Sequence, residues 1–176
     1  MVAHGCVVVA HDALGAELRR ALFDRYLPEI FKLPLETKQR TPTTKGAYVG
    51  YSRPIQGLAC ERIGINEPAN GGSVRAFADI LWPEGNPELW LVLEGLGVRD
   101  ESVCAHLELL DHGIQLSRYG APPDAETSMS MPAHYEYMMN NVIVQHEVEG
   151  LEVRLQDGGW VAISPDPGTF TFVAGE

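Results

Sequence analysis

The stretch "VIVQHEVEGLEVRLQDGGWVAISPDPGTFTFVAGE", residues 142–176, decides the fold. Together with Asn141 just before it, this stretch contains four short apolar segments, "NVIVQ", "LEVRL", "WVAIS" and "TFTFV". They are separated by "EVEG", "QDGG" and "PDPG", which contain the Gly, Pro and Asp residues typical of tight turns. In "GLEVRL" the Leu and Val residues alternate with Glu152 and Arg154, as in a strand with one face on a core. Evenly spaced strands of this kind predict a sandwich, jelly roll or barrel.

The beginning of the chain has a helical pattern instead. Leu14, Leu18 and Leu22 recur every four residues, which predicts an amphipathic helix with Asp12 as its cap. The segments "PEIFKL" and "PLETKQR" follow, and Pro34 is suited to open a short helical turn in the second of them. The first third of the chain is therefore expected to consist of helices and connectors.

The middle of the chain changes pattern several times. Residues 41–70 are rich in Gly, Pro, Ser, Thr and Tyr and predict loop, and "WPEGNPELW" predicts a surface turn. "LVLEGLGV" and "DESVCAHLELL" have a helical period, whereas "GIQLSRY", residues 113–119, alternates like a strand. Together these patterns predict a mainly β protein with N-terminal helices, of the α+β class.

Composition narrows the choice of partners. The chain has 176 residues, enough for one medium domain, and its net charge of −11 with 13 scattered basic residues argues against a nucleic-acid surface. No segment approaches the roughly 20 apolar residues of a membrane helix or has the form of a signal peptide. The charge therefore favours a small-molecule substrate over a polyanion. Cys6, Cys60 and Cys104 lack zinc spacing and are odd in number, so we expect reduced thiols and a cytoplasmic location.

One short motif, "AHYE", combines a histidine and a carboxylate. Residues two apart in an extended chain point to the same side, so His134 and Glu136 can both reach one ion, and their donors suit Fe(II), Mn(II) or Zn(II). The spacing is common, and a surface histidine beside a solvated glutamate is the plain alternative. His146 and Glu147 are adjacent, face opposite sides of a strand and make a poor chelate.

Several strings in order give a more specific indication: "LPLETKQR", "YVGY", "LWPEGNP", "LEGLGV", "LSRYGAP", and "AHYE" followed by residues 142–176. Together they resemble the plant Fe(II)- and 2-oxoglutarate-dependent dioxygenases, the isopenicillin N synthase-like enzymes of hormone and specialised metabolism. The resemblance implies a helical and loop region over residues 1–90 and the first half of a jelly roll, a partial double-stranded β-helix, over residues 91–176. It also implies Fe(II) and 2-oxoglutarate as cofactor and cosubstrate.

The resemblance assigns roles to four residues. His134 falls on the first metal histidine of the family, and Glu136 on its metal aspartate, with one methylene more. Tyr119 matches a tyrosine that contacts 2-oxoglutarate in many members, and Ser117 stands where an asparagine often helps. The alternative is that Tyr119 and Ser117 are ordinary residues of an edge strand without a role in binding. For Ser117 this alternative explains the residue as well as the binding role does.

The family pattern also contains features that are expected but not found. These are a second metal histidine and a 2-oxoglutarate arginine beyond "FTFVAGE", and a helix of about 20 residues where only Glu88, Leu89 and Trp90 stand. A truncated member of the family is therefore expected, with self-association through exposed sheet edges.

Three functions remain open. The first is a dioxygenase that oxidises a small organic metabolite and releases succinate and carbon dioxide. The second is a non-catalytic descendant that acts as a binding or interaction protein, or has no function. The third and weakest is a cupin-like metal binder, which needs a further His or Glu cluster.

Overall fold

The computed structural model describes residues 5–12, 14–42, 50–52, 59–68, 70–95, 112–121 and 129–175. Its contacts divide the chain into two compact units. The first unit comprises residues 1–19 and 133–176, and the second comprises residues 20–132. The predicted helix "DESVCAHLELL" and its His106 lie outside the described residues.

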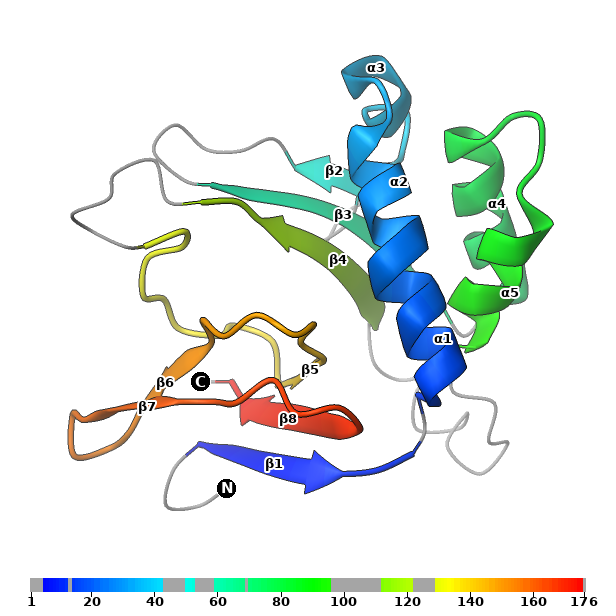
Figure 1. The fold of residues 1–176 in the computed structure, drawn as a ribbon. Coiled ribbons are helices and arrows are strands. Elements are labelled where there is room, and N and C mark those ends of the chain that lie inside the picture. The colour runs from blue at the N-terminus through cyan, green and yellow to red at the C-terminus, as the bar shows by residue number, and fades with distance from the viewer. Residues whose placement is uncertain are drawn as a thin grey trace. The chain divides into compact units, whose positions relative to one another are not determined.

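The first unit is built on a three-stranded antiparallel sheet of strands β1, β8 and β5, in that order (Figure 1). The bounds are Cys6–Ala10 for β1, Asn140–Ile143 for β5 and Thr169–Ala174 for β8. A separate hairpin consists of β6, Glu152–Arg154, and β7, Trp160–Ala162. The strands predicted from residues 141–173 are thus confirmed, and the turns between them fall where their Gly, Pro and Asp residues stand.

The strand β1 corrects the expectation of helices and connectors at the start of the chain. "CVVVA" pairs with β8 in the register Val7 to Phe172 and Val9 to Phe170. Its β-branched valines favour a pleated, half-buried surface. A run of five apolar residues has no period of its own, so only its distant partner identifies it as a strand.

A continuous helical run links residues 16 to 32. It consists of α1, Ala16–Arg20, the π-helical turn η1, Ala21–Tyr26, and α2, Leu27–Lys32. Of the three leucines, Leu22 is buried within the helical run and Leu14 is buried just ahead of it, and the helix begins at Ala16, four residues after Asp12. Pro28 lies in the first turn of α2, directly after the π turn, and it lacks the N–H group that would donate to the helical ladder.

The second unit combines this helical run, from residue 20 onward, with a second three-stranded antiparallel sheet and three further helices (Figure 1). The sheet order is β2-β3-β4, with β2 at Gly50–Ser52, β3 at Cys60–Asn66 and β4 at Gly113–Tyr119. The helices are α3, Leu35–Lys38, α4, Gly71–Leu81, and α5, Pro87–Gly95. Pro34 opens α3 as predicted.

The core of the second unit lies between these helices and one face of the sheet. Its most deeply buried side chains come from the helical run, β3, α4 and α5: Tyr26, Ile30, Ile63, Val74, Leu81, Leu89 and Leu93. Burying each of the aliphatic members stabilises the fold by about 1.5–3 kcal/mol relative to exposure.

Two expectations for the middle of the chain are corrected, and one helix, α4, had no prediction. Residues 41–70 are not all loop, because they contain β2 and β3; β3 is buried on both faces over most of its length, and such strands lack simple alternation. The helix α4 begins at two glycines that resemble loop, and the Asn70 side chain caps it by accepting a hydrogen bond from the Gly72 amide at 2.9 Å. The turn predicted over "WPEGNPELW" ends early, since α5 starts at Pro87.

Candidate functional site

The segment that carries His134 and Glu136 is held against the end of β8. The Gly175 amide donates a hydrogen bond to the Met139 carbonyl at 3.1 Å. A Cβ atom added to Gly175 would lie 1.8 Å from the Met138 carbonyl oxygen and 2.8 Å from that of Glu136. Only glycine therefore allows the two stretches of backbone to approach this closely.

The two side chains of the motif converge, as their spacing predicts. His134 Nε2 lies 3.5 Å from Glu136 Oε1, and the side chains are 45% and 22% exposed. The segment lies outside the strands, because β5 begins six residues after His134. The side chains nonetheless meet on one side of the chain, open to solvent.

The donor set of this pair fits part of a metal centre. Two donors that occupy adjacent positions of an octahedral ion, each about 2.1 Å from it, lie about 3 Å apart, close to the observed 3.5 Å. Glu136 reaches the imidazole despite its extra methylene. Across the described ranges no group of three or more His, Cys, Asp or Glu side chains is arranged to hold a metal, so the pair supplies two ligands.

Ser117 and Tyr119 belong to the second unit, on one face of β4. In the register of the sheet Tyr119 pairs with Cys60 and Ser117 with Arg62. Alternate residues of a strand share a face, and directly opposed residues of paired strands share it too. These four side chains therefore form one surface, called here the Arg62 face.

Polar contacts connect the members of the Arg62 face. The Ser117 hydroxyl accepts a hydrogen bond from the Gln115 amide at 3.1 Å. Burial raises the pKa of the Tyr119 phenol, and the neighbouring Cys60 raises it further, while the positive charge of Arg62 acts in the opposite direction. A phenol is protonated near neutral pH even at its ordinary pKa of about 10, so the Tyr119 hydroxyl is available as a hydrogen-bond donor.

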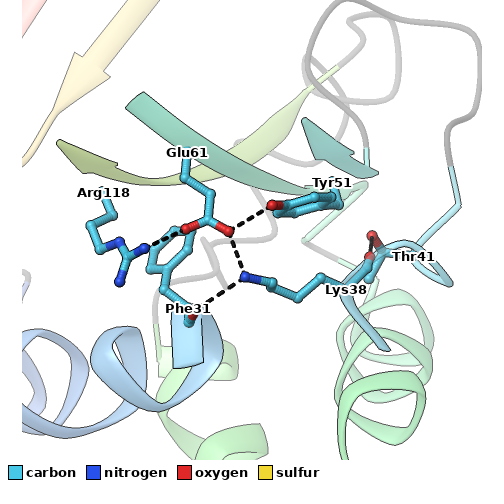
Figure 2. A network of polar contacts seen from close by, with 6 residues as sticks. All are labelled: Phe31, Lys38, Thr41, Tyr51, Glu61 and Arg118. Atoms are coloured by element: carbon cyan, nitrogen blue, oxygen red, sulfur yellow. Dashed lines mark hydrogen bonds and ion pairs between the residues drawn. The ribbon is translucent and has the colours of Figure 1, made fainter. Parts of the chain in front are cut away.

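The opposite face of the same sheet holds a buried ionic network centred on Glu61 (Figure 2). Its Oε1 accepts hydrogen bonds from Lys38 Nζ at 2.5 Å and from the Tyr51 hydroxyl at 2.7 Å, and its Oε2 accepts one from Arg118 at 2.7 Å. Lys38 and Glu61 are each only 6% exposed. The lysine also donates to the Phe31 carbonyl at 3.0 Å.

The donors of this network decide the charge state of Glu61. Burial alone would raise the pKa of the carboxyl group, but the hydrogen bonds from Lys38 and Tyr51 and the charges of Lys38 and Arg118 outweigh it, so the pKa is lowered. An open cavity of about 200 Å³ is lined by Ala59, Glu61, Arg118 and Gly120. Because three donors already satisfy the carboxylate, the network joins α2 and α3 to the sheet rather than offering a free ligand.

Neither the network nor Arg62 emerged from the sequence as a candidate. Lys38, Glu61 and Arg118 are far apart in the chain and carry no local motif. One signal was available only after "CERIGIN" is taken as a strand, because every second residue of a strand shares a face. Arg62 then lies on the face opposite Ile63 and Ile65.

Comparison with known proteins shows similarity to one family. Residues 111–176 match the family model of the 2OG-Fe(II) oxygenase superfamily. A probable 2-oxoglutarate-dependent dioxygenase, AOP1, of Arabidopsis thaliana is 26% identical over 98% of this chain and 60% of its own length. The 2-oxoglutarate-dependent dioxygenase AOP2 of the same plant is 39% identical over 84% of this chain and 37% of its own length. The chain therefore spans about 60% or less of these relatives.

Solved structures agree on the fold. The rice dioxygenase for auxin oxidation superposes with a TM-score of 0.72 at 25% identity, covering 98% of this chain and 62% of that one. The Arabidopsis thaliana dioxygenase for auxin oxidation 1, in a complex with 2-oxoglutarate, gives a TM-score of 0.79 at 20% identity, covering 98% and 71%. These neighbours are jelly-roll oxygenases, which confirms the predicted fold class. No helix in the described part of the chain has the length and apolarity to cross a bilayer.

Proposed function

This chain belongs to the 2-oxoglutarate–Fe(II) oxygenase superfamily, and on that premise we propose that it oxidises a small organic metabolite while 2-oxoglutarate is converted to succinate and carbon dioxide. The observation that supports the proposal most directly is the 3.5 Å approach of His134 Nε2 to Glu136 Oε1. An imidazole and a carboxylate on one side of the chain are two of the three ligands of a facial Fe(II) site.

Each candidate residue has a defined role in this proposal. His134 and Glu136 hold the iron, and Gly175 keeps the segment of Glu136 against β8. Bound Fe(II) supplies the oxidative chemistry, which no protein side chain can perform alone. Ser117 and Tyr119 donate hydroxyl hydrogen bonds to 2-oxoglutarate.

The proposal extends to the organisation and location of the protein. Residues 1–90 form the N-terminal region of the oxygenase, and residues 91–176 form the first half of its jelly roll. The substrate is a small, acidic organic metabolite of the type handled in plant specialised metabolism. We place the protein in the cytoplasm, in keeping with the free thiols of Cys6 and Cys60.

The proposal is tested by turnover. The purified chain is incubated with Fe(II), ascorbate and 2-oxoglutarate, and succinate is measured by NMR over time. We expect iron-dependent succinate release by the wild-type chain and by His146→Ala, which removes a histidine outside the pair. His134→Ala should abolish it. Release at the same rate from His134→Ala would refute the assignment, and no release above that variant would refute catalysis by this chain.

A second function is favoured by one observation: within the described residues, His134 and Glu136 are joined by no third metal-binding side chain. In this case the chain is a non-catalytic protein that binds a metal ion or a small organic acid. Two protein ligands leave at least four positions of a six-coordinate ion to water or other donors. Metal binding that depends on His134 without any succinate release would favour this function over the first.

A further inference from the structure

The open cavity of about 200 Å³ lies where β3 begins and β4 ends. Its lining residues are Ala59, Glu61, Arg118 and Gly120. Glu61 and Arg118 are paired directly in the strand register, and the Gly120 amide donates to the Ala59 carbonyl at 2.6 Å, just beyond the ends of the two strands. Because alternate residues of a strand share a face, these four residues form one continuous surface.

The size of the cavity limits its ligand. Ala59 and Gly120 have almost no side chain, so they leave a hollow beside the pair of Glu61 and Arg118. Pockets for drug-sized ligands measure about 300–1,000 Å³. The smaller volume of this cavity suits a ligand with only a few non-hydrogen atoms.

The charges beside the cavity do not balance. Two cations, Lys38 and Arg118, donate to a single carboxylate, that of Glu61, and Figure 2 shows them on opposite sides of it. Tyr51, the third donor, adds no charge. These four side chains therefore carry one positive charge in excess, in a chain whose net charge is −11. An uncompensated charge in a partly buried site favours the binding of a counter-ion.

Arg118 has donors to spare for such a counter-ion. Its side chain is 54% exposed, and among the described residues its guanidinium makes one hydrogen bond, from Nη2 to Glu61 Oε2 at 2.7 Å. Its Cζ lies 5.3 Å from the centre of the Phe31 ring, so the group is held in place on two sides. A guanidinium has five N–H donors in a planar fork that matches the oxygens of a carboxylate or a phosphate.

The same geometry disfavours a cation as ligand. Both oxygens of Glu61 already accept hydrogen bonds, Oε1 from Lys38 and Tyr51 and Oε2 from Arg118. A cation in the cavity would also meet the excess positive charge of the network. The available chemistry is therefore that of a donor for an anion.

We propose that the cavity beside Arg118 binds a small oxyanion, a carboxylate or inorganic phosphate, with the guanidinium fork as its main donor. The inference goes beyond the proposed function. The site contains neither His134 nor Glu136, and Ser117 and Tyr119 lie on the other face of β4. A bound anion balances the charge of the network and stabilises the second unit in proportion to its occupancy.

Calorimetric titration of the metal-free whole chain in Tris and chloride tests the inference, with inorganic phosphate, acetate and succinate as probes. Loss of a charge-assisted bond in Arg118→Gln should weaken binding by roughly 10- to 100-fold. Arg118→Lys, which keeps the charge and loses the fork, should fall between that variant and the wild type. The matched control is Arg75→Gln on the exposed surface of α4, which should bind like the wild-type chain.

A second variant fills the cavity and leaves the charges in place. In Gly120→Val the new Cβ atom meets Ala59 at 3.5 and 3.6 Å, an ordinary contact, so we expect the variant to fold. Its remaining methyl groups occupy the hollow beside Arg118, and anion binding should be lost. Phosphate should also raise the melting temperature of the wild type more than that of Gly120→Val.

The order of affinities identifies the ligand class: phosphate above acetate and succinate supports a phosphate site, and the reverse order supports a carboxylate site. Unchanged affinity in Arg118→Gln or in Gly120→Val overturns the inference, as does the absence of saturable binding of every probe at millimolar concentration. Equal melting shifts in the wild type and Gly120→Val would reveal a general salt effect and also overturn it. If Arg118→Gln does not melt cooperatively, Arg118→Lys decides, and affinity equal to wild type would refute the role of the fork.

Discussion

Replacement of Lys38 by methionine tests whether the buried network stabilises the second unit. Lys38 Nζ donates to Glu61 Oε1 at 2.5 Å, and both side chains are 7% exposed (Figure 2). Methionine keeps most of the length and apolar stem of lysine and removes its charge. Glu61 then remains buried with Tyr51 and Arg118 as its remaining donors.

The magnitude follows from this geometry. Removing one partner of a buried ion pair costs about 3–5 kcal/mol, because the other charge stays buried without compensation. Since two donors remain on Glu61, we expect the lower end, about 3 kcal/mol. With a urea m-value of about 2 kcal/mol/M, the unfolding midpoint should fall by about 1.5 M.

Urea denaturation followed by circular dichroism measures the effect. Lys32→Met is the matched control, because Lys32 is exposed on α2, and its cost should stay within about 0.5 kcal/mol. The double variant Lys38→Met with Glu61→Met removes both charges and should recover at least about 1 kcal/mol relative to Lys38→Met alone. A loss below about 1 kcal/mol in Lys38→Met, equal to that of the control, would refute the reasoning.

Three further predictions address acid stability, backbone packing and association. The pKa of Glu61 is lowered in the folded chain, because its hydrogen-bond donors outweigh the effect of burial. The ionised carboxylate therefore contributes its full stability above its ordinary pKa of 4.5, and this contribution is lost as the pH falls through the lower pKa of the folded state. The free energy of unfolding should fall less steeply from pH 6 to pH 3 in Glu61→Gln than in the wild type, and identical slopes would contradict this. Gly175→Ala places a Cβ atom 1.8 Å from the Met138 carbonyl oxygen, so the melting temperature and Mn(II) affinity should both drop, and a variant unchanged in both would disprove the close packing. The strand β5 pairs only with β8 among the described strands, and its Val142 is 53% exposed, so sedimentation should show concentration-dependent association that Val142→Lys reduces; a monomer at every concentration would argue against it.

The strands of residues 140–174 could be predicted because their turns carry their own chemistry. Each Gly-, Pro- or Asp-rich link marks a reversal, and the alternation of "LEVRL" survives in the structure as exposed Glu152 and Arg154 around a partly buried Val153. The strands β1 and β3 could not be predicted in the same way. "CVVVA" has no alternation, and most of β3 is buried on both faces, so their identity depends on the strands that pair with them, β8 for β1 and both β2 and β4 for β3.

The candidate site shows the same division between local and distant information. The spacing of His134 and Glu136 predicts their approach, because it is set within three residues. Their position ahead of β5 rather than within a strand depends on the contact with Gly175, 39 or more residues further on, and no local pattern encodes it. Arg118 becomes a candidate only when the register places it beside Glu61.

The central claim is that the imidazole of His134 and the carboxylate of Glu136 hold one divalent ion. Titration of the metal-free chain with Mn(II), followed by the loss of the free-ion electron paramagnetic resonance signal, measures it directly. The account predicts one bound ion per chain in the wild type and in His146→Ala, and binding at least about tenfold weaker in His134→Ala and Glu136→Gln. Equal Mn(II) affinity in the wild type and in these two variants would contradict it.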